Sequence, residues 1–338
     1  MRVLNVVNVN DAYAWGTKLI HNEGELETSR AGDVYSLTEP LAVVYANPWE
    51  RVLFDSWRDA NPFFFLFEGL WLLAGRNDAK WLDRFVHDFS SRFAESDGHL
   101  HGSYGFRWRY HFDVEGGGND SLPDQLDTVA ELLSKNPKDR RVVIQMWDPV
   151  ADLGRDRRDV PCNLTVVPRI IANKLNITVF NRSNDVIWGM FGANAVQFSM
   201  LLEYLAGRIG VRMGTYTQVS TNAHLYRAHE DKVVSSSLFM RGGYPEWVPM
   251  GQNWDVWDRD LQTFMEWADD WEQQPPTYPD NPWFENTAQP LFAAHAMWKQ
   301  GERKAALELI QDPIFEIAPD WRKAAGQWML RRIDKEKA

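Results

Sequence analysis

The sequence predicts an α/β (α+β) protein, in which strands are combined with helices. Two segments, Leu164–Ala172 and Leu175–Asn181, alternate apolar and polar residues as paired strands do. A third, Pro62–Ala74, is aromatic and aliphatic throughout, which is typical of a buried helix. Apolar residues make up 44% of the 338 residues and aromatic residues 13%, enough for one large domain or two.

The first fifty residues predict two strands or more and one helix. Val3–Val9 is apolar enough for a short strand, and Ala12–Ile20 has the spacing of an amphipathic helix. Glu25–Ala46 is strand-like on both sides of a turn at Arg30–Asp33.

The helix Pro62–Ala74 begins at an Asn-Pro pair, and Gly75 is suited to end it. Glu68 interrupts its apolar run. A carboxylate in such surroundings is costly unless it is paired or functional, and local sequence leaves both readings open.

The next segment predicts a helix over Asp78–Phe93 and an exposed loop over Glu95–His101. The loop histidines alternate without a third ligand, so we expect no metal site there. Gly102–Arg109 suits either a ligand-facing loop or a packed corner, and Gly116–Gly118 a surface loop. Leu122–Ser134 predicts an amphipathic helix.

The second half predicts a strand over Arg140–Trp147 and then a hairpin that turns at Asn173-Lys174. Further expected elements are a helix at Ala195–Ala206 capped by Gly207, a strand at Val211–Ser220, and C-terminal helices separated by the proline-rich segment 274–282. We expect a catalytic domain over 1–253 and a helical extension over 254–338 packed on it. No glycine-rich phosphate loop occurs, so a nucleotide would be bound by side chains.

Charge and hydropathy exclude several classes of protein. The net charge of −11 argues against nucleic-acid binding, which needs a basic surface. The apolar run Phe63–Leu73 is far shorter than the ~20 residues of a membrane span. The N-terminal apolar residues meet Asn8 too early for a secretory leader, so we expect a cytoplasmic enzyme.

Cys162 is the single cysteine, which excludes an intramolecular disulfide and a paired-cysteine metal site. It is either a small buried residue or a nucleophile. Arginines both before and after it in the chain favour the nucleophile, because a neighbouring guanidinium lowers the pKa of a thiol.

Several motifs in order then resemble the thymidylate synthase and pyrimidine nucleotide hydroxymethylase superfamily. The resemblance covers roughly Arg30 to Tyr226. It is carried by Glu68-Gly69-Leu70-Trp71, Tyr104-Gly105-Phe106-Arg107-Trp108, Arg140-Arg141, Pro161-Cys162, Arg182-Ser183-Asn184-Asp185-Val186 with Gly189 and Asn194, and His224-Leu225-Tyr226.

The resemblance implies a large twisted mixed sheet flanked by helices, two subunits packed sheet against sheet, and a role for each matching residue. Cys162 would add as thiolate to C6 of a pyrimidine nucleoside monophosphate, whose C5 then attacks 5,10-methylenetetrahydrofolate, with no metal. The resemblance further implies that Arg30, Arg182 and Ser183 bind the 5′-phosphate together with Arg140 and Arg141 of a partner subunit. His224 and Tyr226 would bind the sugar, and Asn194 would bind the base. Glu68 and Tyr104 would transfer protons, and Asp185 would contact the pterin.

Departures from the synthase pattern favour water over hydride as the final reactant. No tryptophan aligns near Phe89 to shield the methylene intermediate, and a charged helix ending at Ala338 replaces a short apolar tail. Asn163 stands where synthases carry histidine. We therefore expect a hydroxymethyl product and tetrahydrofolate, with methylation to thymidylate as the alternative.

The sequence narrows the choice of base and sugar in the nucleotide substrate less far. An amide at Asn194 matches the O4 and N3-H of uracil, although its spacing from Gly189 is one residue longer than in the synthases. Uracil and cytosine both stay open, and Arg140 and Ser183 match the deoxynucleotide enzymes. The other class of function left open is a non-catalytic nucleotide-binding protein on the same fold.

Overall fold

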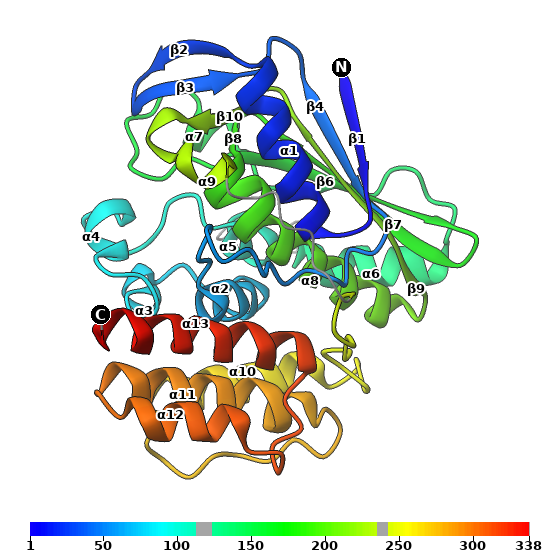
Figure 1. The fold of residues 1–338 in the computed structure, drawn as a ribbon. Helices are drawn as coiled ribbons and strands as arrows, with labels where there is room; N and C mark the ends of the chain where they lie inside the picture. Colours follow the sequence, from blue (N-terminus) through cyan, green and yellow to red (C-terminus); the bar gives the residue numbers. More distant parts are fainter. Residues whose placement is uncertain (113–123, 235–242, 338) are drawn as a thin grey trace.

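A computed structural model describes residues 1–112, 124–234 and 243–337. Its large sheet has six strands in the order β1-β4-β9-β7-β6-β5, with parallel and antiparallel neighbours (Figure 1). The strands are β1 Arg2–Val6, β4 Leu41–Tyr45, β5 Ile144–Gln145, β6 Asn163–Ile171, β7 Lys174–Asn181 and β9 Arg212–Ser220. The predicted α/β class with a mixed sheet flanked by helices is confirmed.

A second sheet of four strands is ordered β2-β3-β10-β8. It comprises β2 Glu25–Ser29, β3 Gly32–Ser36, β8 Asn184–Asp185 and β10 Ala223–Tyr226. The turn between β2 and β3 begins at Arg30, as the sequence predicts. Because β8 follows β7 and β10 follows β9, this sheet continues from the edge of the large sheet where Cys162 lies.

The hairpin of β6 and β7 turns one residue earlier than predicted. Ala172 and Asn173 both have left-handed backbone conformations, with φ of 50° and 59°, which is the geometry of a tight hairpin turn. Lys174 therefore already pairs with Ile171.

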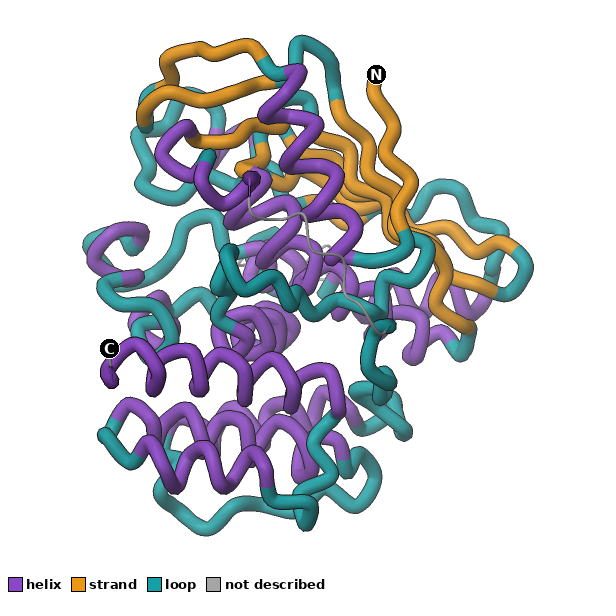
Figure 2. Tube along the Cα trace, in the orientation of Figure 1, coloured by secondary structure: helices purple, strands orange, loops and turns teal. Residues whose placement is uncertain are grey.

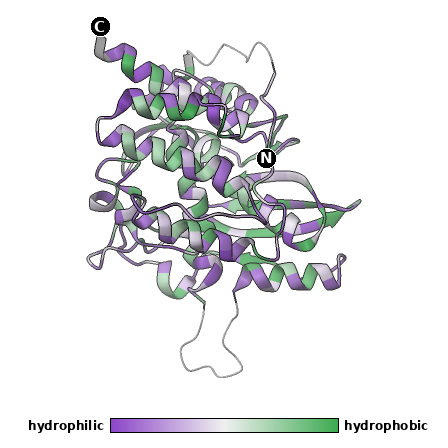
Figure 3. Cartoon of the chain, turned by 90° about the horizontal axis from the view of Figure 1, so that it is seen from below, coloured by the Kyte–Doolittle hydropathy of each residue, from purple (hydrophilic) through white to green (hydrophobic). Residues whose placement is uncertain are grey.

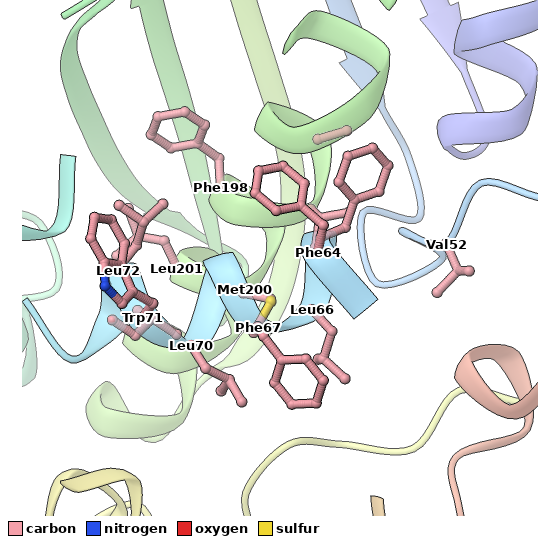
Figure 4. Packing of buried hydrophobic residues seen from close by; sticks show 14 of the residues in the cluster. Val52, Phe64, Leu66, Phe67, Leu70, Trp71, Leu72, Phe198, Met200 and Leu201 are labelled. Atoms are coloured by element: carbon pink, nitrogen blue, oxygen red, sulfur yellow. The ribbon is translucent and has the colours of Figure 1, made fainter. Parts of the chain in front are cut away.

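Helix α2, Pro62–Leu73, is the centre of the core. The Asn61 side chain accepts hydrogen bonds from the amides of Phe63 and Phe64, and a proline occupies the first turn, as the Asn-Pro pair predicts. Helix α8, Asn194–Ile209, packs on one side, and Figure 4 shows its Phe198, Met200 and Leu201 beside α2. Because α2 also contacts the C-terminal helices, it is apolar all round.

Further helices cover the sheet and build a layer below α2 (Figures 1 and 2). The short helices are α3 Ala79–Leu82, α4 Phe89–Phe93, α5 Tyr104–Arg109, α7 Pro149–Asp152, α9 Asp231–Val234 and the 3₁₀ turn η3 Arg227–His229. The longer helices are α1 Val9–Glu23 and α6 Gln125–Lys135, and the C-terminal layer holds α10 Trp257–Asp269, the π-helical η4 Phe284–Ala288, α11 Gln289–Lys299, α12 Arg303–Gln311 and α13 Pro319–Lys337. Figure 3 shows hydrophobic residues along the strands and on one side of several helices.

Four local predictions are wrong. The predicted helix Asp78–Phe93 is broken between Leu82 and Phe89, because Asp88 is left-handed and the Asp83 carboxylate instead accepts from the amide and hydroxyl of Ser90. The predicted strand Arg140–Trp147 reduces to β5. Helix α8 passes Gly207 and ends at Gly210, whose φ is 79°.

The fourth prediction, an exposed loop over Glu95–His101, is wrong only at its end: residues 96–99 are exposed, whereas the loop closes on buried Leu100 and partly buried His101. Its ring is only 13% exposed, because it bonds Asp152 at 2.7 Å beside the fully buried Arg107. Gly102–Arg109 is a packed corner: Ser103 is followed by α5, whose Arg107 and Arg109 are buried in ion pairs.

The remaining expectations concern membranes, metals and one loop. Within the described residues, every helix is too short or too polar to cross a bilayer, and nowhere do three metal-binding side chains gather. Gly116–Gly118 lies outside the described residues, as do Leu122 and Pro123 at the expected start of α6.

Candidate active site

Cys162 lies in the turn that leads into β6, where the ends of three strands meet. Its carbonyl accepts a hydrogen bond of 3.0 Å from the amide of Arg182, the residue after β7. Asn163 pairs in register with Asn181, and Asn181 with Ser220 on β9. The edge of the large sheet therefore fixes the thiol and the Arg182 backbone together.

The Arg182 side chain folds back over this turn. Its Nε donates to the Pro161 carbonyl and its Nη2 to the Val160 carbonyl, both at 2.9 Å. The same Nη2 lies 3.7 Å from the Cys162 Sγ, and the guanidinium lies over the Trp147 ring. The side chain is exposed, so it can contact the thiol and a ligand oxygen together.

The pKa of the Cys162 thiol is raised above its ordinary value, which corrects the expectation of a lowered one. Burial of the sulfur is the largest cause, and the charge of Asp159 adds to it. Arg182 does lower the pKa, as expected, but its contribution is smaller than that of burial. Without a ligand, the thiol is therefore mostly protonated near neutral pH.

Glu68 extends from the middle of α2 towards α8. Its Oε2 accepts a hydrogen bond of 2.7 Å from Gln197 Nε2. Burial raises the pKa of Glu68 to about 8, and Asp159 raises it too, while the Gln197 hydrogen bond acts in the opposite direction. The functional interpretation of Glu68 is favoured over a buried ion pair, because Gln197 is neutral.

Tyr104, the first residue of α5, lies in the same group. Burial raises the pKa of its phenol well above the ordinary value, and the nearby charges of Cys162, Asp159 and Glu68 act in the same direction. The backbone at Gly102 explains the placement: a Cβ there would lie 2.9 Å from Pro161 N, so only glycine allows this approach.

Asn163, directly after the cysteine, is fully buried beside Tyr104, and a hydrogen bond with Asn163 acts to lower the pKa of that phenol. The Oε1 of Gln197, beside Glu68, is buried and unpaired. An unpaired amide oxygen at this depth is costly, so it is suited to accept from water or substrate.

Sequence reasoning missed Asp159 and Gln197. Asp159 accepts a hydrogen bond of 3.1 Å from the Gly102 amide, and its charge raises the pKa of Cys162, Glu68 and Tyr104. Its position three residues before the single cysteine was the available signal. Gln197 lay in an ordinary helical pattern and gave none.

The second sheet brings a further set of predicted residues to this edge. Asp185 on β8 and His224 on β10 are register partners, and the His224 and Tyr226 rings lie 5.2 Å apart. Asp185 and Cys162 raise the pKa of Tyr226, after burial as the largest cause, whereas Arg30 lowers it. The structure thus groups these residues near Cys162, with the Arg30 turn at the far end of β10.

Asn194 begins α8 directly after an irregular segment. Residues Val186–Ala193 form the π-helical turn η2, and Gly192 within it has a non-helical backbone. Asn194 is buried and its Nδ2 donates to Asn184 Oδ1 at 3.2 Å, while Asn184 Nδ2 has no partner. π-helical turns of this kind are frequent at functional sites.

Arg140, Arg141 and Ser183 have no described side-chain contact with the other predicted site residues. Arg140 and Arg141 lie exposed before β5, and Arg141 bonds Asp139 at 2.7 Å. Ser183 is half-buried next to Arg182. The expected contribution of Arg140 and Arg141 to a partner subunit stays a prediction.

Comparison with known proteins agrees with this arrangement. Residues 59–244 match the family model described as thymidylate synthase. A deoxyuridylate hydroxymethyltransferase of Pseudomonas phage M6 is 38% identical over 348 residues, which cover 98% of this chain and 95% of that protein. One of Bacillus phage SP01 is 34% identical over 60% of this chain and 53% of that protein.

More distant relatives carry a different name. A putative thymidylate synthase of Methanosarcina acetivorans is 29% identical over 69% of this chain and 93% of that protein. The residues that the family model matches include α2, the Cys162 turn and the strands β5 to β10, whereas β1 to β4 precede them. The chain therefore belongs to the thymidylate synthase family.

Proposed function

We propose that this protein is a deoxyuridylate 5-hydroxymethyltransferase, which joins dUMP, the one-carbon unit of 5,10-methylenetetrahydrofolate and water to give 5-hydroxymethyl-dUMP and tetrahydrofolate. One observation carries the proposal: the relative from phage M6 with that name is similar over 98% of this chain, C-terminal helices included. The site geometry supports it step by step.

The nucleophile is the Cys162 sulfur, which adds to C6 of the uracil ring and makes C5 able to attack carbon. Arg182 is placed to stabilise the forming thiolate, with its Nη2 3.7 Å from Sγ, and to bind the 5′-phosphate beside Ser183 and Arg30. His224 and Tyr226, edge to face on β10, would bond the sugar hydroxyl.

Proton transfer falls to the group around Glu68. With a pKa of about 8, its carboxyl exists in both protonation states near neutral pH and can take up and return protons. Tyr104 is placed to help remove the C5 proton. The loss of this proton and of tetrahydrofolate leaves a methylene group on C5, with Cys162 still bonded to C6.

Water then completes the reaction. It adds its oxygen to the methylene, the electron pair returns through the ring, and the C6–S bond breaks to release the Cys162 thiolate. The polar amide of Asn163, next to the nucleophile and beside the Tyr104 hydroxyl, supports a hydrated site. Synthases carry histidine here.

The uracil ring suits the amide pair beside η2. Because Asn194 Nδ2 donates to Asn184, the pair still offers the Asn194 oxygen as acceptor and the unpaired Asn184 Nδ2 as donor. One acceptor and one donor can meet N3-H and O4 of uracil, and with the amides turned round they can meet N3 and the amino group of cytosine. The choice of dUMP over dCMP therefore rests on the phage M6 relative.

The folate fits the outer wall of the site. Asp185 offers a carboxylate to the pterin nitrogens, and the half-exposed indole of Trp188 offers a stacking face. Beneath that indole, Arg58 is buried with its Nη2 unpaired. When bound, the folate supplies the one-carbon unit, and these residues orient it.

The test is mass spectrometry of the nucleotide formed from methylenetetrahydrofolate and dUMP, dCMP or CMP in separate reactions, with dihydrofolate followed by absorbance. We expect hydroxymethyl-dUMP without dihydrofolate. A methylated product with dihydrofolate would identify a synthase instead, the reaction named for the methanogen relatives. The Cys162→Ser variant should release no C5 tritium, and retained release would contradict the whole mechanism.

A further inference from the structure

The C-terminal helix α13 lies outside the residues that match the family model, yet it bonds the segment next to the proposed folate wall. Its Arg331 donates to Asp59 Oδ1 at 3.0 Å. Arg332 makes a two-pronged contact with both Asp59 oxygens at 3.1 Å, and Lys335 lies 3.9 Å from Oδ2. Three cations of one helix thus surround a single carboxylate.

This contact is held firmly on both sides. The Arg332 guanidinium stacks on Trp328, with its central carbon 3.7 Å from the ring centre. Asp59 has a left-handed backbone, with φ of 49°, which an aspartate adopts only at some cost. The two arginines keep the pKa of Asp59 below its ordinary value although burial acts to raise it, so the carboxylate is ionised.

The residue before Asp59 reaches the active site. Arg58 is 3% exposed, its Nε donates to the Ile187 carbonyl at 2.9 Å, and its guanidinium lies 4.3 Å from the centre of the Trp188 ring. Ile187 and Trp188 belong to η2, the irregular turn that Asp185 caps through a 2.9 Å bond to the Ile187 amide. Arg58 therefore supports the segment that carries the proposed folate contacts.

A π-helical turn needs such support because its backbone bonds are irregular. Gly192 departs from helical geometry, and a Cβ there would lie 3.0 Å from the Ile187 carbonyl and 3.2 Å from the Phe65 ring. The Ile187 carbonyl thus faces Arg58 and the Gly192 backbone in a closely packed space. Movement of Arg58 would shift η2 directly.

We infer that α13 is a positioning element for the folate-binding wall, acting through Asp59 and Arg58 on η2. The inference rests on the proposed role of Asp185 and Trp188 at the folate, and it assigns Arg331 and Arg332 as positioning residues that never touch substrate.

The test compares Arg331→Ala/Arg332→Ala with Arg331→Lys/Arg332→Lys, and uses Lys304→Ala as control. Lys304 is an exposed lysine of α12 paired only with Glu308 in the described contacts. Calorimetry gives the Kd of dUMP, and then the Kd of tetrahydrofolate for the dUMP complex. We expect the alanine variant to weaken folate binding about fivefold or more, with dUMP binding within about twofold and cooperative unfolding retained.

The lysine variant should recover most of the folate affinity, and the control should match the parent protein. Unchanged folate binding in a folded alanine variant would overturn the inference, as would equal weakening for both ligands, which indicates general damage.

A measurement without ligand separates this inference from the proposed function. Hydrogen exchange of the amides of residues 186–194 should accelerate about fivefold or more in the alanine variant and not in the control. Faster exchange in a protein that binds no folate would refute the proposed function alone. Unchanged exchange would refute the positioning role, whatever the protein binds.

Discussion

The pKa of Glu68 can be tested through its one hydrogen bond in the described site. Gln197→Leu removes the donor that lies 2.7 Å from Oε2 and keeps the volume of the side chain. A hydrogen bond to a charged group contributes about 1.5–3 kcal/mol, and 1.36 kcal/mol corresponds to about one pKa unit. Because the bond stabilises the ionised form, its loss should raise the pKa of Glu68 from about 8 by about one to two units.

The assay is the pH dependence of kcat/KM for tritium release from C5-labelled dUMP. The inflection near pH 8 should move to about pH 9 or higher in Gln197→Leu and vanish in Glu68→Gln. Gln262→Leu is the matched control, because Gln262 donates to Glu266 at 2.8 Å on the exposed face of α10. An inflection that stays in place or moves down in Gln197→Leu would refute the assignment of Glu68.

Three further predictions concern the residues around Cys162 and Glu68. Because Glu68 holds its proton more tightly in the folded protein, the free energy of unfolding should fall as the pH rises from the ordinary pKa of 4.5 to about 8. The Tm of Glu68→Gln, measured by calorimetry, should therefore increasingly exceed that of the parent protein across this pH range. Alkylation by iodoacetamide reports Cys162 alone, and its pH midpoint should fall in Asp159→Asn and rise in Arg182→Ala; shifts of the same sign in both would contradict the electrostatic account. In a single turnover with enzyme in excess, Asn163→Leu should slow hydroxymethyl product formation about tenfold or more while tritium release keeps its rate, and equal slowing of both would show that Asn163 serves an earlier step.

Elements with strong local signals were predicted from the sequence. The start of α2 could be predicted from the Asn-Pro pair because helix capping is a local interaction. The Asn61 side chain bonds the amides of Phe63 and Phe64, only two and three residues further along the chain. The β6–β7 hairpin was readable from alternation. Its turn was misplaced by one residue, because the sequence did not reveal that Ala172 adopts a left-handed conformation.

The failures share a cause in tertiary contacts. The predicted helix Asp78–Phe93 breaks because Phe85 packs against Phe67 and Phe292, which are distant in sequence, while Asp83 caps the next turn. Gly207 lies inside α8 because Trp254 packs against its backbone, so this glycine serves packing rather than helix termination. No local pattern contains this information.

Site residues that stand in sequence motifs were proposed from the sequence. Residues that only the tertiary structure brings to the site were not. Cys162, Arg182 and Asp185 stand in recognisable motifs. Gln197 has a place in the proposed site because α8 brings it to Glu68. Arg58 has one because the fold brings it to the Ile187 carbonyl of η2. Supporting residues of this kind acquire a role from their position in three dimensions.

The raised pKa of Cys162 changes how the reaction must begin. A thiolate prepared in advance by Arg182 would react with any electrophile that enters the site. Instead burial raises the pKa of the sulfur, and the hydrogen bonds of Arg182 go to the carbonyls of Pro161 and Val160. Attack on C6 then requires the proton to leave as the nucleotide binds, and the neighbouring carboxyls of Asp159 and Glu68 can receive it, directly or through water. Under the proposed mechanism, nucleotide binding and loss of the thiol proton would therefore be one event, and the sulfur would stay less reactive before the nucleotide binds.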